Sequence, residues 1–498
     1  MDQPSTSNKL PGSSSSVKNK TNSKSKKETS SSSSLPQRQV GSEVQQEVML
    51  SWGDYLNERK DVQWICGVEY FNHAPFGTEK WQNFAKHGMV VEVPNGKDPS
   101  TYWPATVFGF AGYNALVEYV RIDEKTSGRP QMCWIPFCSK VPKPLGYCLT
   151  NDILLKPVSE IDQKDPEFLK KTFTKLAAKK LPTVKPDHWE HCLEELKLTS
   201  SRFKLNEVVE ALDKHDCSRN RIGTISMMLG NRIHVQYVGL EDDDEGFWFC
   251  QQSEHVHKIG WSHAVGAELV GASPNLAYPL PSSSEFQVVP AGVKVVKNAM
   301  FEMRHPVHLH EICVAYVVEP LRNGYFLAGT DWTRKNETVE IVMHITSDYI
   351  LPINFCRKHG IDLVIPKKDG KEIMKFSWRK YLADVECTAM DLSAIKKEEA
   401  KFTKGCKMEA VDLKEPTYLG PVTVTAVCGH LLQIHFDGYP RTEEDSFQWV
   451  SAQSSDIYPA CYSQFIGHKL GNKPDRPNPA DLCYFTDPEP STSTSSKR

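Results

Sequence analysis

The 498-residue sequence has no apolar run near the roughly 20 residues that a membrane-spanning helix needs, so we expect no membrane contact. It also lacks an excess of either charge, because 59 Lys and Arg residues face 62 Asp and Glu residues. This balance argues against electrostatic capture of nucleic acid by the whole molecule. The 14 cysteines include no CxxC pair, the close spacing that structural zinc sites use. The sequence therefore supports neither a zinc site nor a disulfide framework.

Catalytic and cofactor-binding motifs are also missing. The chain contains no GxxxxGK[ST] or GxGxxG phosphate loop and no GxSxG elbow. His305, His308 and His310, with Glu311 beside them, do not form HExxH, and on a strand His305 would not share a face with the other two. We expect no enzyme, no cofactor and no metal. The alternative is an enzyme assembled from scattered Cys and His, which a thiolate beside an oriented histidine would support.

Both ends of the chain have the composition of disordered tails. Residues 1–46 are rich in Ser and Lys and contain no apolar segment of the kind that signal peptides have. Without such a segment, we expect reduced thiols in the cytosol or nucleus. The lysines between positions 18 and 27 suit nuclear import or weak contact with nucleic-acid phosphates, although a solvated tail is an equal alternative. Residues 476–498 are predicted to form a second disordered tail.

Between the tails, one block of sequence recurs four times. In each copy a small or apolar residue opens a β-rich run, and the run closes 14 positions later: Ala105 and Tyr119, Gly223 and Tyr237, Ala315 and Gly329, Val422 and Phe436. Each block has turn residues at its centre and predicts a β-hairpin. A first strand is predicted before each hairpin, beginning near Gly88, Asn206, Gly292 and Gly405. An aromatic residue follows each hairpin, with an aliphatic residue eight positions later: Tyr147 and Leu155, Trp261 and Leu269, Phe355 and Leu363, Tyr462 and Leu470.

Segments with helical spacing precede some copies. The run Ser-Trp-Gly-Asp-Tyr-Leu at Trp52 matches Ser-Trp-Arg-Lys-Tyr-Leu at Trp378, and Trp189 has a similar place before the second copy. We expect these segments to be helical arms that pack against a neighbouring barrel. The sequence thus predicts a mainly β protein of four small barrels with helical arms, over residues 47–158, 159–275, 276–367 and 368–475.

The fourth copy carries the residues of a recognisable family. It contains GCKMEAVD at residues 405–412, HFDGY at 435–439, Trp449, and SDIYP at 455–459. This pattern resembles the malignant brain tumour (MBT) repeat, and the shared spacings extend the resemblance to all four copies. The resemblance implies four MBT repeats, each a Tudor-like (SH3-like) barrel with a helical arm, in a non-enzymatic nuclear chromatin protein. Such four-repeat proteins act in Polycomb-type and synthetic-multivulva class B repression and read methylated lysine on histone H3 or H4 tails.

A methylated ammonium keeps its charge but is bulkier and less hydrated, so aromatic faces arranged as a box bind it well. An acidic residue at the floor adds a charge-assisted hydrogen bond to any remaining N–H, which favours mono- and dimethyl-lysine. The resemblance places the floor at Asp412 and the walls at Phe436, Tyr439 and Phe447.

Two further residues, Glu415 and Trp449, are less direct candidates for this site. Glu415 stands where the family often has Asn, and for Trp449 we favour a place in the barrel core. The loop of residues 440–445 is also longer than the family's usual loop, which puts the position of the third wall in question.

The other copies lack complete boxes. Ile122 replaces the second wall after Tyr119, Leu240 replaces it after Tyr237, and the third copy combines Trp332 with Gly329. The sequence therefore predicts one working pocket, in the fourth repeat, with the other repeats holding the assembly together or presenting surfaces to repressor-complex proteins or to the rest of the histone tail. The alternative is a repeat scaffold of a repressor complex with a vestigial pocket. A third alternative is nucleic-acid binding through the basic tail.

Overall fold

The computed structural model describes residues 52–53, 56, 65–122, 130–158, 166–240, 246–272, 279–330, 339–368, 371–372, 375–468 and 470–471. Both predicted tails and Trp332 lie outside these residues. In the described part of the chain, no helix is long and apolar enough to cross a membrane.

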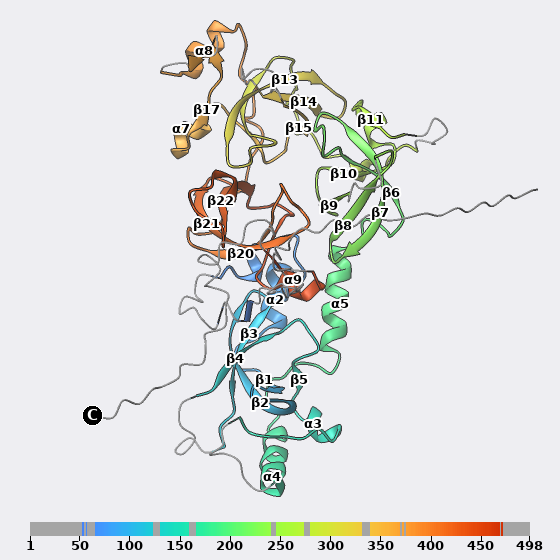
Figure 1. The fold of residues 1–498 in the computed structure, drawn as a ribbon, viewed down its shortest axis with the longest axis vertical. Coiled ribbons are helices and arrows are strands. Elements are labelled where there is room, and N and C mark those ends of the chain that lie inside the picture. Colours follow the sequence, from blue (N-terminus) through green and yellow to red (C-terminus); the bar gives the residue numbers. More distant parts are fainter. Residues whose placement is uncertain are drawn as a thin grey trace, which may run out of the picture. The chain divides into compact units, whose positions relative to one another are not determined.

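Four curled sheets follow one another along the chain (Figure 1). The first contains β1 (Val90–Asn95), β2 (Asp98–Ala111), β3 (Asn114–Tyr119), β4 (Met132–Pro136) and β5 (Lys143–Pro144). The second contains β6 (Val208–Leu212), β7 (Asn220–Leu229), β8 (Arg232–Tyr237), β9 (Phe247–Cys250), β10 (Val256–Lys258) and β11 (Leu269–Val270). The third contains β12 (Met300–Arg304), β13 (Ile312–Pro320), β14 (Tyr325–Thr330), β15 (Glu340–His344), β16 (Ile350–Leu351) and β17 (Leu363–Val364). The fourth contains β20 (Lys407–Val411), β21 (Leu419–Cys428), β22 (Leu431–Phe436), β23 (Phe447–Ser451) and β24 (Ile457–Tyr458), and β18 (Lys367–Lys368) pairs separately with β19 (Lys371–Glu372).

The helical segments of the described residues are short and lie before, between or after the strands of the four sheets. They are η2 (Val68–Tyr70), α2 (Gly77–Phe84), α3 (Tyr147–Thr150), α4 (Pro166–Ala177), α5 (His188–Thr199), α6 (Trp261–Val265), η4 (Ser283–Glu285), α7 (Phe355–His359), α8 (Trp378–Asp384), η5 (Glu444–Ser446) and α9 (Tyr462–Ile466). The mainly β fold that the sequence predicts is confirmed, with curled open sheets in place of closed barrels.

All four sheets have the same antiparallel strand order, such as β4-β3-β2-β1-β5 in the first and β23-β22-β21-β20-β24 in the fourth. In three copies the residues predicted at a separation of 14 are direct partners across the hairpin: Ala105 with Tyr119, Gly223 with Tyr237, and Val422 with Phe436. Every hairpin also has a β-bulge at the same place, just after these partners. The common register makes positions in different repeats directly comparable.

The third repeat departs from the prediction in two ways. Ala315 pairs with Thr330, so the counterpart of Phe436 is Thr330 and not Gly329. The predicted first strand near Gly292 is wrong, because β12 begins at Met300 and pairs with β13. Residues 292–297 are rich in valine, which favours strands, but Met300–Arg304 occupies the partner positions on β13.

A buried glutamate on the first strand repeats in all four units. Glu92, Glu210, Glu302 and Glu409 are fully buried. Each accepts backbone N–H groups from the start of the short helix that follows its own hairpin, for example those of Asn354 and Cys356 at Glu302 (both 2.7 Å). These N–H groups have no partner within the helix, and the helix dipole favours a negative charge there. The predicted aromatic residues therefore begin helices α3, α6, α7 and α9.

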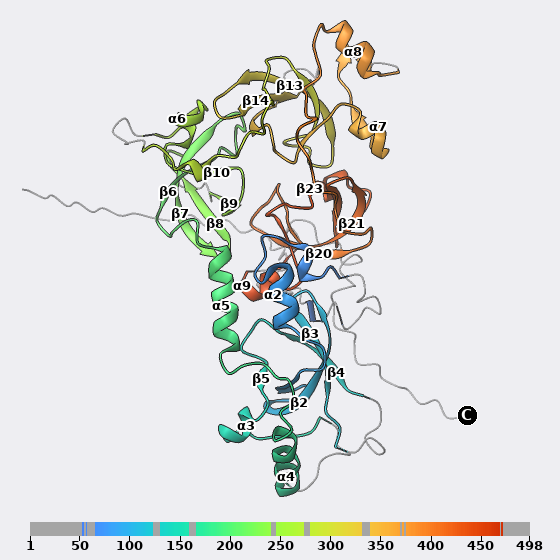
Figure 2. The ribbon, with the colours of Figure 1, turned by 180° about the vertical axis from the view of Figure 1, so that it is seen from behind.

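The helical arms pack against a neighbouring repeat, as predicted. Trp378 Nε1 in α8 donates to Glu302 Oε1 of the third repeat (2.7 Å). The matching Trp52 Nε1, which precedes the first repeat, donates to Glu409 Oε1 of the fourth (2.6 Å). The first and fourth repeats thus contact one another, and α2 and α9 lie side by side in both views (Figures 1 and 2), within one hydrophobic cluster.

Candidate functional site

The two faces of the fourth sheet have different surroundings. Leu432, Ile434 and Phe436 point into the core of their own repeat, because they share a cluster with Met408 and Val422. Leu431 and Trp449 lie in another cluster, with residues of the third repeat. Successive side chains on a strand point to opposite faces. We call the two sides of the sheet the core face and the outer face.

Asp412 and Phe436 lie together on the core face. Asp412 follows β20, and its Oδ1 accepts from Gln448 Nε2 and from the backbone N–H of Lys414 (both 3.0 Å). Gln448 is fully buried and pairs with Ile434, so its side chain is on the core face. It therefore holds the Asp412 carboxylate on the side of the sheet that carries the Phe436 ring.

Tyr439 also reaches this region, through the turn after β22. Gly438 has φ of 97°, a conformation that glycine adopts without strain. The Asp437 carboxylate accepts from Lys407 Nζ and Thr423 Oγ1 and fixes the turn. The rings of Phe436 and Tyr439 are 6.5 Å apart at 81°, an edge-to-face arrangement, and are 3% and 8% exposed.

The other aromatic candidates do not join them. Phe447 pairs with His435, whose ring is 4.7 Å from its own, and this pair belongs to the outer face. Trp449 is 3% exposed and packs against the third repeat, where its backbone N–H donates to the oxygen of Leu309 (2.8 Å). Glu415 lies in the turn that follows Asp412. The structure thus brings Phe436 and Tyr439 together and places Asp412 on the same face of the sheet.

Tyr418 is a core-face aromatic residue that the sequence analysis missed. Val411 pairs with Leu419, so the antiparallel register places Tyr418 opposite Asp412. Gly420 follows two residues later along the same strand, so Tyr418 and Gly420 point to the same face of the sheet.

Two glycines bring the rings of Tyr418 and Phe436 close to the backbone. A Cβ on Gly420 would be 2.9 Å from Cδ1 of Phe436, so the Phe436 ring lies directly over the backbone of that glycine. A Cβ on Gly471 would be 3.5 Å from Cδ1 of Tyr418. Gly471 follows Leu470, which pairs with Leu419. The ring of Phe436 therefore lies over Gly420, and the ring of Tyr418 lies beside Gly471, on two neighbouring segments of backbone.

The second repeat shows what the same positions do when they carry other residues. Its register makes Asp213 the counterpart of Asp412, and makes Arg219 and Arg221 the counterparts of Tyr418 and Gly420. Asp213 Oδ2 is 3.2 Å from Arg219 Nε and 2.8 Å from Arg221 Nη2. Burial raises the pKa of Asp213, but its hydrogen bonds to the arginines and to the backbone outweigh burial and lower it. An internal ion pair thus fills this place in the second repeat.

The first and third repeats differ in another way. In the first repeat the acid is replaced by Asn95, whose Nδ2 donates to the backbone oxygen of Lys156 (3.0 Å). In the third it is replaced by His305, whose Nδ1 accepts from the backbone N–H groups of Val307 and His308. The counterparts of Phe436 in the first two repeats are tyrosines with internal hydrogen bonds: the Tyr119 hydroxyl donates to Pro94 O (2.7 Å) and the Tyr237 hydroxyl to Leu212 O (2.6 Å). In the third, Thr330 occupies this position.

The histidines that the sequence analysis considered as metal ligands, His305, His308 and His310, lie in one segment, and His305 and His310 contact neighbouring protein groups. His305 is buried within its loop, and His310 Nε2 is 3.8 Å from Glu311 Oε1 and 3.7 Å from Glu444 Oε2. Within the described ranges, no group of three or more His, Cys, Asp or Glu side chains is arranged to hold a metal ion.

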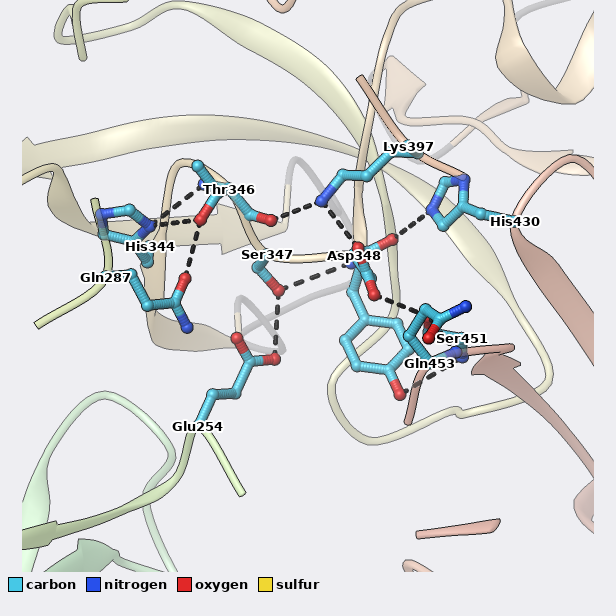
Figure 3. Close-up of polar contacts among 11 residues, drawn as sticks. Glu254, Gln287, His344, Thr346, Ser347, Asp348, Lys397, His430, Ser451 and Gln453 are labelled. Atoms are coloured by element: carbon cyan, nitrogen blue, oxygen red, sulfur yellow. Dashed lines mark hydrogen bonds and ion pairs between the residues drawn. The ribbon is translucent and has the colours of Figure 1, made fainter. Parts of the chain in front are cut away.

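A polar junction joins the third and fourth repeats (Figure 3). Its centre is Asp348, in the loop between β15 and β16. The carboxylate accepts from Lys397 Nζ (2.7 Å) and Ser451 Oγ (2.6 Å), and the backbone oxygen accepts from His430 Nε2 (2.7 Å). Burial raises the pKa of Asp348, but the Lys397 ammonium and the hydrogen bonds outweigh it and lower the pKa. The ionised carboxylate therefore ties two repeats together.

The same loop also reaches the second repeat, because Ser347 Oγ donates to Glu254 Oε1 (3.0 Å). Within the third repeat, the Arg304 guanidinium lies 3.6 Å from the ring centroid of Tyr349 in this loop. A cavity of about 300 Å³ lies beside this loop and is lined by residues of the second, third and fourth repeats and by His73, which precedes β1. Hydrogen bonds between lining residues of different repeats, such as Ser347 with Glu254 and Ser451 with Asp348, indicate a role in assembly of the repeats.

Comparison with known proteins identifies the repeated unit. A model of the MBT repeat matches residues 89–162, 207–271, 299–369 and 406–477, the four units that contain the four sheets. The chain belongs to the MBT repeat family. The four MBT repeats expected from the sequence are thereby confirmed, while their outer boundaries stay predictions.

Relatives are similar over most of this chain. MBT domain-containing protein 1 is 31% identical over 436 residues in Xenopus tropicalis, where the alignment covers 84% of this chain and 64% of that protein, and the human protein is also 31% identical, with 66% covered. This chain thus spans about two thirds of the length of these relatives. Polycomb protein Sfmbt of Drosophila melanogaster is 28% identical over 82% of this chain and 35% of that protein. The crystal structure of the four MBT repeats of Drosophila melanogaster Sfmbt, in complex with the peptide RHR(me)KVLR, superposes with a TM-score of 0.70 at 27% identity, over 85% of this chain and 98% of that one.

Proposed function

We propose that this protein is a nuclear, chromatin-associated reader that binds methylated lysine on histone tails through its fourth MBT repeat and acts, without catalysis, in transcriptional repression. The proposed pocket consists of Asp412, Phe436, Tyr439 and Tyr418. Support comes from the family, from the methylated-lysine peptide in the related Sfmbt structure, and from the Polycomb name of that relative.

The observation that carries the assignment to the fourth repeat is the contrast with the second. Both have an aspartate at the same position, but the two arginines that face Asp213 are replaced by Tyr418 and Gly420. These replacements exchange two internal cations for an aromatic ring beside Asp412 and for a glycine that leaves room for the Phe436 ring. A cationic ligand can then take the place of the arginines beside Asp412.

Phe447 is not part of this pocket in our proposal, since its ring contacts His435 on the outer face. Tyr418 supplies the third aromatic wall instead. Each wall contributes on the order of 0.5–2 kcal/mol to binding of a methylated ammonium. The Asp412 carboxylate adds a charge-assisted hydrogen bond worth about 1.5–3 kcal/mol when the ammonium keeps an N–H. Mono- and dimethyl-lysine should therefore bind more tightly than trimethyl-lysine.

Titration calorimetry with histone H3 and H4 peptides that carry un-, mono-, di- or trimethylated lysine tests the proposal. The wild-type protein should prefer mono- or dimethylated peptide over its unmodified form. Asp412→Asn, which keeps the side-chain shape, should weaken that binding roughly 10- to 150-fold.

Tyr418→Leu and Phe447→Leu form a matched pair for the third wall. Tyr418→Leu should weaken binding by a factor of about 2 to 30, and Phe447→Leu should leave it within about twofold. The reverse order would assign the wall to Phe447, and equal binding of all methylation states by every variant would reject the reader function.

The first three repeats have a second role in the proposal, as a scaffold. Their pocket positions hold internal hydrogen bonds or ion pairs, and the junction around Asp348 joins the second and third repeats to the fourth. If the purified protein binds repressor-complex proteins but shows no preference for methylated peptides, the scaffold function stands alone.

A further inference from the structure

Two cysteines far apart in the sequence lie together where the arm before the first repeat meets the fourth repeat. Ile65 pairs with Lys407 in a parallel bridge, and the backbone N–H of Cys66 donates to the oxygen of Lys407 (2.9 Å). Cys406 immediately precedes Lys407. The backbone contact therefore places Cys66 beside the residue that follows Cys406.

The two side chains also share their surroundings. Cys66 is buried in the core of the fourth repeat, and Cys406 packs against the same cluster while staying partly accessible to solvent. The thiol of Cys66 is within hydrogen-bonding reach of the Cys406 sulfur. The Thr403 hydroxyl lies 3.7 Å from the Cys406 sulfur on another side. Cys406 is thus the reachable member of the pair, and Cys66 is the enclosed one.

The hydrogen bonds make the two thiols chemically unequal. Donation from Cys66, helped by Thr403 and backbone groups, outweighs burial and lowers the pKa of Cys406 to about 6. Burial, together with Cys406, raises the pKa of Cys66 well above its ordinary value. By contrast, burial raises the pKa of Cys217 to about 11 and also raises that of Cys133. A thiolate supported by a neighbouring thiol is the arrangement that reactive dithiols use.

We propose that Cys406 and Cys66 are a peroxide-sensitive thiol pair, in which Cys406 is the nucleophile and Cys66 the resolving thiol, and that oxidation links the N-terminal arm covalently to the fourth repeat. The Cys406 thiolate attacks one oxygen of a hydroperoxide, the O–O bond breaks, and an alkoxide or hydroxide leaves and takes up a proton. The product is a sulfenic acid on Cys406. The Cys66 sulfur then attacks the Cys406 sulfur, a disulfide forms, and water leaves with the proton of the Cys66 thiol. Two thiols and one hydroperoxide thus give one disulfide, one alcohol or water, and a second water.

The link would fasten β20 at its start, and β20 leads directly to Asp412 at its end. The same arm already contacts this strand through Trp52 and Glu409. A disulfide here would therefore add a covalent but reducible bond to the contact by which the first and fourth repeats meet. This inference does not depend on methyl-lysine binding, because it concerns the opposite end of β20.

Mass spectrometry of the full-length protein tests the pair. The protein is treated with micromolar hydrogen peroxide, alkylated with iodoacetamide and digested with trypsin. We expect the peptide of residues 61–80 to be linked to that of residues 405–407, and dithiothreitol to release both. Without peroxide, iodoacetamide at pH 7 should modify Cys406 at least tenfold faster than Cys133 or Cys217.

Serine variants separate the two roles. Cys66→Ser should lose the linked peptide and accumulate a dimedone-reactive sulfenic acid on Cys406, while Cys406→Ser should lose both products. Cys387→Ser, which removes a partly exposed thiol elsewhere, should behave as the wild type. Absence of the linked peptide from folded wild-type protein, or Cys406 alkylation no faster than that of Cys133, would overturn the proposal.

Discussion

Replacing Tyr418 by arginine should convert the fourth-repeat pocket into the filled pocket of the second repeat. Arg219 holds the equivalent position there, and its Nε is 3.2 Å from the Asp213 carboxylate. In Tyr418→Arg, the new guanidinium would face Asp412 and take the place of the ligand's ammonium. The variant should fold, because the second repeat accommodates the same pair within the same strand register.

The size of the effect follows from two losses. One aromatic wall is worth about 0.5–2 kcal/mol, and the charge-assisted hydrogen bond about 1.5–3 kcal/mol. Together they amount to about 2–5 kcal/mol, which corresponds to roughly 30-fold to several-thousand-fold weaker binding. Titration calorimetry with a dimethyl-lysine peptide measures this directly.

Thr417→Arg is the matched control for this experiment. Thr417 is exposed and adjacent, so the substitution adds the same charge without placing it opposite Asp412. We expect binding within a few-fold of the wild type. Equal losses in both variants would mean that net charge controls binding, and unchanged binding by Tyr418→Arg would refute the pocket geometry.

Three further predictions concern the supports of the pocket. Trp52→Phe removes a donor from a buried carboxylate, so it should lower the free energy of unfolding by about 1–3 kcal/mol in urea titrations, and no change would show that the arm does not hold the fourth repeat. Burial raises the pKa of Glu409 to about 7 from an unfolded value of 4.5, so its contribution to stability falls as the pH rises between these values; the melting temperature should drop over this range in the wild type, and a Glu409→Gln variant with the same slope would contradict this. Asp348→Ala leaves the Lys397 ammonium without its carboxylate and should cost about 2 kcal/mol in the same titrations, and less than about 0.5 kcal/mol would mean that the junction contributes little.

The sequence predicted the architecture because the patterns that define it, such as the register of each hairpin, depend only on residues within one repeat. The separation of 14 residues is the register of a bulged hairpin, and it holds for Val422 and Phe436 as it does for two other pairs. The match between the segments at Trp52 and Trp378 reflects a common task, since both indoles donate to a buried glutamate. Which repeat each arm contacts could not be predicted, because that depends on how the first repeat meets the fourth.

The candidate site was predictable only in part. Asp412, Phe436 and Tyr439 follow from the family pattern, and the structure places them on one face of the sheet, with the rings of Phe436 and Tyr439 edge to face. The family resemblance also predicts Phe447 as a wall, but strand alternation turns its side chain toward His435. Tyr418 carries no sequence motif of its own. Comparison with Arg219 in the second repeat would have revealed it, since both immediately precede a central strand.

The position of the methylated side chain is best tested by NMR with a peptide whose dimethyl-lysine carries ¹³C-labelled N-methyl groups. If those methyl groups lie against the faces of Tyr439 and Tyr418, ring currents should move their proton resonance upfield on binding. The shift should decrease in Tyr439→Leu and Tyr418→Leu and persist in Phe447→Leu. A bound peptide whose N-methyl resonance does not move, or moves equally in all three variants, would contradict an aromatic pocket in the fourth repeat.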